Sequence, residues 1–142
     1  MASQNQILID SNILIYALNA DSPKSDLALA FLLQLKNSVI AEQNILETLR
    51  VMTHPTFGLQ LETENILDTI SEILPDVHII RPNDSTYKFF LTLLDSVPVS
   101  GNHIFDTYLV ATMLSHRITS IATDNVKDFK IYSHIQVNNP FM

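Results

Sequence analysis

The stretch ILIDSNILIYAL, residues 7–18, combines two kinds of apolar segment with one acid between them. Residues 7–9 form an apolar run that suits a buried strand, and residues 13–18 have the apolar character of a packed helix. Asp10 lies at the junction, where a carboxylate serves either as a helix cap or as a ligand beyond the carboxyl end of a strand. Residues 7–18 therefore predict a strand followed by a helix, with Asp10 as the first candidate functional residue.

The rest of the chain continues this alternation of strands and helices. Further short strands are predicted at 38–41, 77–80, 120–122 and 135–137, with helical segments between them. Strands separated by helices require right-handed crossovers, which build a parallel sheet covered on both faces. We therefore expect the α/β class, as a three-layer α/β/α sandwich with a central mostly parallel sheet.

Two helices are predicted in more detail because they carry acids. The helix after residue 41 is expected to bury Ile45, Leu46, Leu49 and Met52, with Glu47 on the opposite, solvated face. The segment 104–114 is apolar almost all the way round, which predicts a buried helix.

Composition limits the class of protein. The 142 residues fit a single domain, 1–142, with 46% hydrophobic residues to form its core. No signal sequence or membrane-spanning run is present, so we expect a soluble cytoplasmic protein with no membrane partner. The absence of cysteine excludes disulfides and thiolate metal sites, and two glycines leave no glycine-rich phosphate loop. A net charge of −7 disfavours general coating of nucleic acid, but permits acids that hold cations against a phosphate substrate.

Five acids are candidates, and each also has a structural explanation. Asp10 can cap a helix, Asp106 can interact favourably with a helix N-terminus, and Glu47 can be an ordinary solvated side chain. Asp124 and Asp128 lie in TDNVKDF, which is also typical of a polar turn. The parallel topology places the segments after the first and fourth strands at one edge of the sheet, which favours a shared site for Asp10 and Asp124.

The histidines provide a weaker signal than the acids. His103 lies three residues before Asp106, where a ligand or a general base is conceivable. It has no second histidine at paired ligand spacing, so we expect an ordinary polar residue.

Four segments, taken in order and spacing, resemble the PIN-domain ribonucleases, specifically the VapC-type toxins of toxin–antitoxin pairs. The resemblance extends over nearly the whole chain and is carried by ILIDSNILIYAL, NILETLRVMTHP, IFDTYLVATML and IATDNVKDF. It implies a PIN-like fold and metal-dependent hydrolysis of RNA phosphodiesters that leaves a 5′-phosphate and a 3′-hydroxyl.

Carried over by motif, the resemblance implies a site of four acids: Asp10, Glu47, Asp106 and Asp124. It gives Asp10 and Asp106 the direct metal bonds, and Glu47 and Asp124 a role toward a second ion or the attacking water. The fourth position departs from the family pattern. Members often have an acid two residues after the threonine of this motif, where this chain has Asn125, so Asp124 or Asp128 completes the site.

The same resemblance implies supporting residues, a cofactor and partners. Asn12 and Thr123 would hold the carboxylates in place, and Mg²⁺ or Mn²⁺ would relieve the repulsion between them. The partners implied are a single-stranded or structured RNA substrate, a small cognate antitoxin with a basic arm, and a second copy in a homodimer. The apolar helices of residues 62–74 and 87–94 are candidates for the dimer interface.

Two alternative functions are compatible with the same residues. A phosphoacceptor signalling domain would use Asp10, although such domains place their acceptor after the third strand, where this chain has Arg81. A PIN-like scaffold that binds partners without cleaving RNA is indicated only by Asn125.

Overall fold

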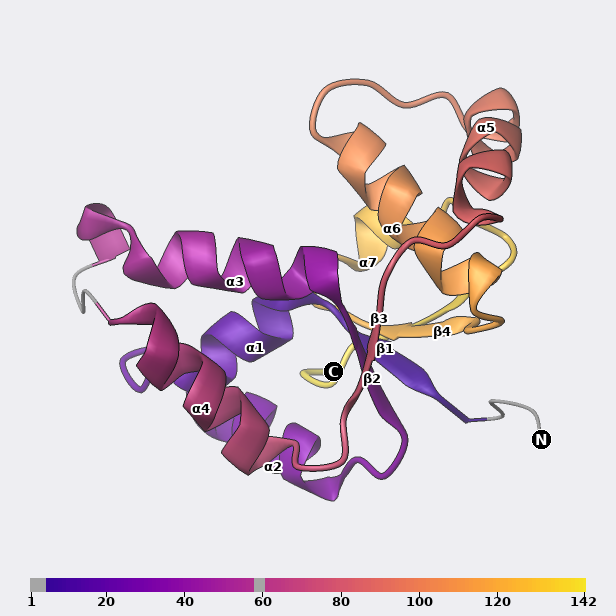
Figure 1. The fold of residues 1–142 in the computed structure, drawn as a ribbon. Coiled ribbons are helices and arrows are strands. Elements are labelled where there is room, and N and C mark those ends of the chain that lie inside the picture. The colour runs from indigo at the N-terminus through magenta and orange to yellow at the C-terminus, as the bar shows by residue number, and fades with distance from the viewer. Residues whose placement is uncertain (1–4, 58–60) are drawn as a thin grey trace.

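The computed structural model describes residues 5–57 and 61–142. Within these residues the chain forms five strands, seven α-helices and one short 3₁₀ helix (Figure 1). In chain order they are β1 (Ile7–Ile9), α1 (Ser11–Leu18), α2 (Ser25–Gln34), β2 (Ser38–Ala41), α3 (Glu42–Thr53), η1 (Pro55–Phe57), α4 (Thr63–Ile73), β3 (His78–Ile80), α5 (Thr86–Ser96), α6 (His103–Ser115), β4 (Ser120–Ala122), α7 (Val126–Phe129) and β5 (Gln136–Asn138).

The five strands form one sheet in the order β3-β2-β1-β4-β5, and all four pairings are parallel. In the register, Leu8 of β1 is paired with Val39 of β2 on one side and with Ile121 of β4 on the other. From β1 the chain proceeds outward to β2 and β3, then returns to the far side of β1 to form β4 and β5. The direction of strand order therefore reverses between β1 and β4, and in open α/β sheets ligands bind beyond the carboxyl ends at such a reversal.

Helices cover both faces of the sheet (Figure 1). Because successive strand residues point to opposite faces, Leu8 packs in a cluster with α5 and α6, and Ile9 packs in a cluster with α1 to α4. Both side chains are fully buried. The expected three-layer α/β/α sandwich with a parallel sheet is confirmed.

Two details of the predicted burial are wrong. Leu46 of α3 is 67% exposed, because the buried face of this helix is instead formed by Asn44, Thr48 and Met52 at four-residue spacing. The polar members of this face are satisfied locally: the Thr48 hydroxyl donates to the carbonyl of Asn44 at 2.7 Å. The first turn of α6 is also not buried, since Phe105 is 64% exposed.

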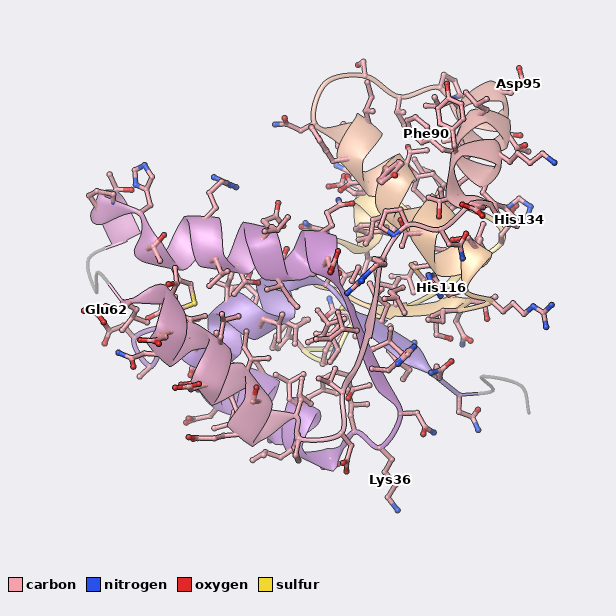
Figure 2. All side chains as sticks on the ribbon, viewed as in Figure 1. Lys36, Glu62, Phe90, Asp95, His116 and His134 are labelled. Carbon is pink, nitrogen blue, oxygen red and sulfur yellow. The ribbon has the colours of Figure 1, made fainter. Side chains whose placement is uncertain are left out.

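Surface side chains are drawn in Figure 2, where Lys36 and Asp95 extend from opposite ends of the molecule. Both are exposed, so they provide control positions remote from the site described next. None of the helices in the described part of the chain is both long and apolar enough to cross a membrane.

Candidate active site

Asp10 follows β1 directly and is the N-cap of α1. Its carboxylate is buried, with the residue 6% exposed, and each of its oxygens accepts two hydrogen bonds. Oδ1 accepts from the Ser11 amide at 2.9 Å and from Asn44 Nδ2 at 3.3 Å. Oδ2 accepts from the Thr123 hydroxyl at 2.7 Å and from Asn12 Nδ2 at 3.4 Å. The capping role and a buried, oriented carboxylate are therefore combined in one residue.

The charge of Asp10 is held at a cost. Burial raises the pKa of this carboxyl from 3.8 to about 6, although the hydrogen bonds from Thr123 and Ser11 act in the opposite direction. The nearby carboxylates of Glu47 and Asp106 add to the increase. The four donors around Asp10 are neutral groups, so none of them neutralises the charge of this carboxylate when it is ionised.

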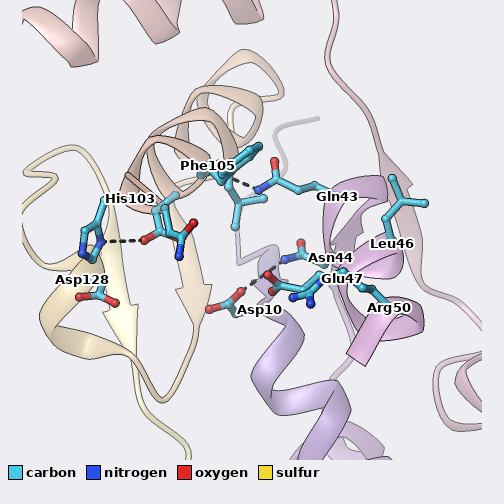
Figure 3. A pocket seen from close by; sticks show the side chains of 12 residues that line it. Asp10, Gln43, Asn44, Leu46, Glu47, Arg50, His103, Phe105 and Asp128 are labelled. Carbon is cyan, nitrogen blue, oxygen red and sulfur yellow. Dashed lines mark hydrogen bonds and ion pairs between the residues drawn. The ribbon is translucent and has the colours of Figure 1, made fainter. Parts of the chain in front are cut away.

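A pocket of about 670 Å³ opens between α3 and the N-terminal end of α6. Figure 3 shows Asn44 and Glu47 on the α3 side, His103 and Asp128 on the opposite side, and Asp10 between them. The two walls are joined by a hydrogen bond from Gln43 Nε2 to the carbonyl of Phe105 at 3.0 Å. The residues that line the pocket are Asp10, Gln43, Asn44, Leu46, Glu47, Arg50, Asn102, His103, Phe105, Asp106, Leu109 and Asp128.

Glu47 lies on the exposed side of α3, as its helical position predicts, and this side faces the pocket. Its carboxylate accepts a hydrogen bond from the Ser11 hydroxyl. Because Ser11 is the residue after Asp10, this bond ties α3 to the start of α1. Helical periodicity places Glu47 correctly on the exposed side, but only the neighbouring α6 turns that side into a pocket wall.

Asp106 lies in the first turn of α6, half-buried on the opposite wall. Burial raises the pKa of its carboxyl, His103 opposes this, and the carboxylates of Asp128 and Glu47 reinforce it. His103 Nδ1 is 3.3 Å from Asp106 Oδ2. One potential ligand atom from each of His103, Asp106 and Asp128 lies within 4.8 Å of the other two. His103 is thus a member of the acidic cluster, which favours the ligand interpretation over the ordinary polar residue that the sequence analysis preferred.

Asp124 does not line this pocket. Its carboxylate is 2.5 Å from Lys24 Nζ and accepts from the Tyr16 hydroxyl at 3.0 Å. Lys24 holds the pKa of Asp124 below its usual value, with Tyr16 and Asn139 assisting. The loop after β4 therefore directs Asp124 toward α1 and the start of α2, whereas Asp128, four residues further along the chain in α7, faces the pocket.

The structure thus brings Asp10, Glu47, Asp106 and Asp128 to one pocket and places Asp124 elsewhere. Thr123 and Asn12 contact the Asp10 carboxylate, and the Asn125 amide donates to Thr123 Oγ1 at 3.0 Å. Asn44 is a further residue of the site, which the sequence alone did not indicate. The available signal was the four-residue spacing of Asn44, Thr48 and Met52, which places the three side chains on one face of the helix.

The donor set of the pocket fits a hard divalent cation. Its four carboxylates supply the oxygen ligands that Mg²⁺ and Mn²⁺ prefer, and His103 adds a nitrogen that suits Mn²⁺ better than Mg²⁺. Asp10 and Asp106 both have raised pKa values, caused first by burial and then by neighbouring acids. A bound cation would stabilise the charged forms of both carboxylates and so oppose these increases in pKa.

Fold and pocket together define an α/β protein with a cluster of acids beyond the carboxyl edge of its parallel sheet. The family model described as the PIN domain matches residues 7–134. The chain belongs to the PIN domain family, which confirms the resemblance found in its four sequence segments.

Comparison with individual proteins supports this assignment. Ribonuclease VapC48 of Mycobacterium tuberculosis is 30% identical over 96 residues, 66% of this chain and 66% of that protein, which is slightly less than two thirds of its length. Ribonuclease VapC24 of the same organism is 25% identical over 137 residues, 93% of this chain and 94% of that protein. Among solved structures, a toxin–antitoxin complex from Klebsiella pneumoniae has a chain that superimposes with a TM-score of 0.64 and 20% identity, covering 95% of this chain and 98% of that chain.

Proposed function

We propose that this protein is a metal-dependent endoribonuclease that hydrolyses RNA phosphodiesters and acts as the toxin of a toxin–antitoxin pair. The observation that carries the proposal is the convergence of Asp10, Glu47, Asp106 and Asp128 on one pocket. The relatives named as VapC ribonucleases support the same reaction class. The proposal takes residues 1–142 as one nuclease domain acting in the cytoplasm, in keeping with the family match over residues 7–134.

Mg²⁺ or Mn²⁺ is the cofactor that the pocket favours. Asp10, Asp106 and Asp128 would hold it, with Glu47 on the opposite wall available for a second ion or for the attacking water. When bound, such an ion lowers the pKa of a water molecule and stabilises negative charge on the phosphate and the leaving oxygen. Asp128 takes the fourth place in this proposal because Asp124 is engaged with Lys24 outside the pocket.

The residues of the chain perform the remaining tasks. Four donors hold the Asp10 carboxylate in one orientation, which preorganises the site before substrate arrives. Glu47 accepts the proton of the attacking water as the water oxygen bonds to phosphorus. The bond from phosphorus to the 3′-oxygen breaks, and solvent protonates that oxygen, leaving a 5′-phosphate and a 3′-hydroxyl. Arg50 lies on the same wall as Glu47 and is placed to contact a non-bridging phosphate oxygen.

The charge of the protein shapes the choice of RNA. With a net charge of −7 and one arginine in the pocket, RNA is held by few phosphate contacts, so binding is weak and falls as salt rises. Selectivity then comes from exposed bases of a single-stranded segment or loop.

A toxin requires a neutralising partner. The Klebsiella pneumoniae chain of similar fold belongs to a toxin–antitoxin complex, which supports the proposal of a small antitoxin for this chain. An arginine-bearing arm of that partner would complement the acidic pocket. The proposed homodimer would use the exposed apolar residues of α4 and α5, namely Leu67, Tyr87, Phe89 and Leu91.

The test is metal-dependent cleavage of a mixed pool of single-stranded and structured RNA. Protein stripped with a chelator is expected to be inactive, and Mg²⁺ or Mn²⁺ is expected to restore cleavage with 5′-phosphate products. Asp10→Asn and Asp106→Asn should each lose at least about a hundredfold in rate, as removal of a catalytic electrostatic group typically does. Asp95→Asn, at the exposed control position, should cleave like the wild type.

Other outcomes would identify the alternatives. Metal binding without cleavage of any RNA would favour a PIN-like scaffold, and full activity of both pocket variants would refute the proposed site. Phosphorylation of Asp10 by a small phosphodonor would indicate the signalling alternative. The sequence disfavours it, because the residue that follows the third strand, where such domains place their acceptor, is Arg81.

A further inference from the structure

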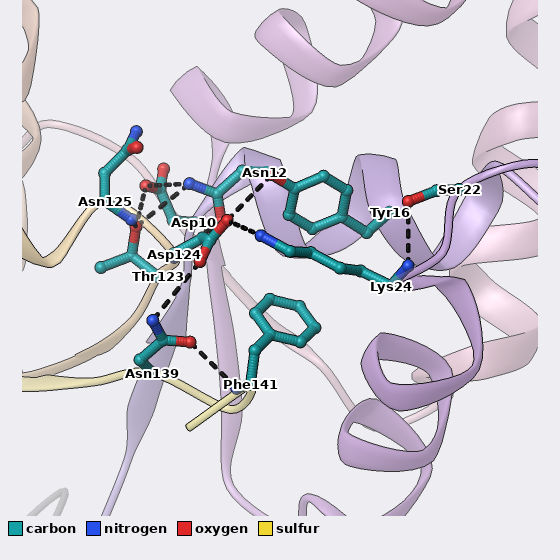
Figure 4. A network of polar contacts seen from close by, with 10 residues as sticks. All are labelled: Asp10, Asn12, Tyr16, Ser22, Lys24, Thr123, Asp124, Asn125, Asn139 and Phe141. Carbon is teal, nitrogen blue, oxygen red and sulfur yellow. Dashed lines mark hydrogen bonds and ion pairs between the residues drawn. The ribbon is translucent and has the colours of Figure 1, made fainter.

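A second polar cluster, outside the pocket, connects three distant parts of the chain (Figure 4). At its centre is the Asp124–Lys24 ion pair, with the two charged atoms 2.5 Å apart. The Lys24 ammonium lies 5.1 Å from the ring centroid of Tyr16 and 5.2 Å from that of Phe141. Asn139 Nδ2 is 3.4 Å from the second Asp124 oxygen. We call these five residues the Asp124 clasp.

The clasp holds the C-terminal end of the chain against α1. The rings of Tyr16 and Phe141 meet edge to face with centroids 5.5 Å apart, and the Phe141 amide donates to Asn139 Oδ1 at 2.9 Å. A surface ion pair by itself contributes little to stability. Here the Asp124 carboxylate accepts hydrogen bonds from three donors, and the Lys24 ammonium lies over two aromatic rings. These shared contacts leave the side chains of the clasp few alternative arrangements.

From Asp124 a short series of hydrogen bonds leads to Asp10. The backbone amide of Asp124 donates to Asn12 Oδ1 at 3.2 Å, which orients the amide group of that side chain. Asn12 Nδ2 then donates to Thr123 Oγ1 at 3.1 Å and lies 3.4 Å from Asp10 Oδ2. The backbone amide of Asn125 also donates to Thr123 Oγ1, at 3.0 Å.

These contacts determine the direction of the Thr123 hydroxyl. A hydroxyl has one proton and two acceptor positions. Asn12 and Asn125 occupy the acceptor positions of Thr123, so its proton is directed to Asp10 Oδ2, 2.7 Å away. The conformation of the loop at residues 123–125 therefore decides whether Asp10 receives this bond.

We propose that Lys24 and Asp124 are positioning residues, which act through the loop at 123–125 to hold the Asp10 carboxylate in its metal-binding orientation, with Phe141 closing the clasp from the C-terminus. The proposal rests on the proposed function, since it requires Asp10 to be a metal ligand. It also explains why Asp124, although next to the threonine of the motif, faces away from the pocket: its carboxylate supports the site without bonding to the metal.

The test compares Lys24→Met, Lys24→Arg and the control Lys36→Met, in which an exposed lysine outside the clasp is replaced. In the metal-free protein, backbone hydrogen exchange at Asp124 and Asn125 is expected to be about tenfold faster in Lys24→Met, while exchange at Leu8 in the sheet is unchanged. Calorimetric titration with Mn²⁺ should show about threefold to tenfold weaker binding, somewhat less than the roughly 10–100-fold loss typical when a direct partner of a ligand is removed. Lys24→Arg should retain most of the affinity, because arginine keeps the ion pair and the ring contacts.

The kinetic readout separates positioning from stability. Lys24→Met should lower kcat for RNA cleavage at fixed Mn²⁺ while leaving KM for RNA unchanged, at a temperature where the variant is folded. If it folds poorly, Phe141→Ala serves as the milder variant and should shift exchange and Mn²⁺ affinity in the same direction. Wild-type exchange and Mn²⁺ affinity in these variants would overturn the positioning role while leaving the nuclease proposal intact. A wild-type protein that neither binds Mn²⁺ nor cleaves RNA would overturn the proposed function, and the positioning role with it.

Discussion

The buried carboxylate of Asp10 leads to a prediction about stability that is independent of RNA cleavage. Burial raises the pKa of this carboxyl from 3.8 to about 6 in the folded protein, and such a difference corresponds to about 3 kcal/mol. Because the folded-state pKa lies above the unfolded-state value, the folded protein binds the proton more tightly. Stability is therefore favoured at low pH and is lost as the pH rises from 3.8 through 6.

The perturbation is Asp10→Asn in the metal-free protein. The variant removes the buried charge, so its free energy of unfolding should gain on the wild type by about 0.6 kcal/mol near pH 4 and by about 3 kcal/mol near pH 7. A second effect reduces both values by about 1–2 kcal/mol: the new NH₂ group must face donors that the carboxylate accepted from, such as Thr123 and Asn12. This second effect does not depend on pH. The change in the difference with pH, about 2 kcal/mol, therefore isolates the cost of burying the charge.

The assay is urea unfolding in the presence of a chelator, at several pH values between about 4 and 7, for both proteins. Asp95→Asn, at an exposed carboxyl remote from the pocket, is the matched control for replacing an aspartate by asparagine. The same Asp10→Asn protein should be inactive, so the residue would trade stability for function. A difference between Asp10→Asn and wild type that stays constant over this pH range would refute the argument that burial strains this carboxylate.

Three further predictions concern other positions. Asp128→Asn should weaken Mn²⁺ binding by about tenfold or more and Asp124→Asn by less, because only Asp128 faces the pocket. Calorimetry measures both affinities, and a larger loss for Asp124→Asn would show that Asp124 is the fourth acid of the site. Tyr132→Phe should lower the free energy of unfolding by about 1 kcal/mol, since it removes the 2.6 Å bond to Thr107 that lies in the core; urea unfolding measures this, and an unchanged midpoint would contradict it. Met52→Ala should lower the free energy of unfolding by about 2–5 kcal/mol in the same experiment, because this side chain of α3 is fully buried in the core. A decrease below about 1 kcal/mol would mean that the core around Met52 is loosely packed.

Much of the fold followed from local pattern. Short apolar runs such as residues 38–41 and 120–122 became strands at the predicted residues, since runs of this length between helices can be satisfied only inside a covered parallel sheet. The proximity of Asp10 to the segment after β4 followed for the same reason, because β1 and β4 are neighbours and end on one side. The shared site expected for Asp10 and Asp124 did not follow, because Asp124 lies outside the pocket. The helix boundary near His54 agrees with the restriction that proline places on the preceding residue.

The errors arise where burial depends on a partner element. Leu46 was expected to be buried by helical periodicity, but α3 presents Asn44 and Thr48 to the rest of the fold and leaves Leu46 at the pocket rim. Periodicity identifies the faces of a helix, and only tertiary packing decides which of them meets a neighbour. Asn44 was overlooked for this reason: its role depends on Asp10, which lies 34 positions away in the chain.

The sequence alone determined the α/β class, the parallel arrangement of the strands and the positions of Asp10 and Asp124 just after two of them, because these depend on short-range apolar patterns and on where strands end. Glu47 and Asp106 were indicated only by the resemblance to the PIN-domain ribonucleases. Tertiary structure decided which acids enter the pocket. Asp124 and Asp128 are equivalent in a local reading of TDNVKDF. In the folded protein Lys24, 100 positions earlier, forms an ion pair with Asp124, whereas Asp128 in α7 faces the pocket. The role of a carboxylate depends on the charges and donors that surround it in space. For Asp124 these neighbours come from α1 and the start of α2, and for Asp128 they come from α6.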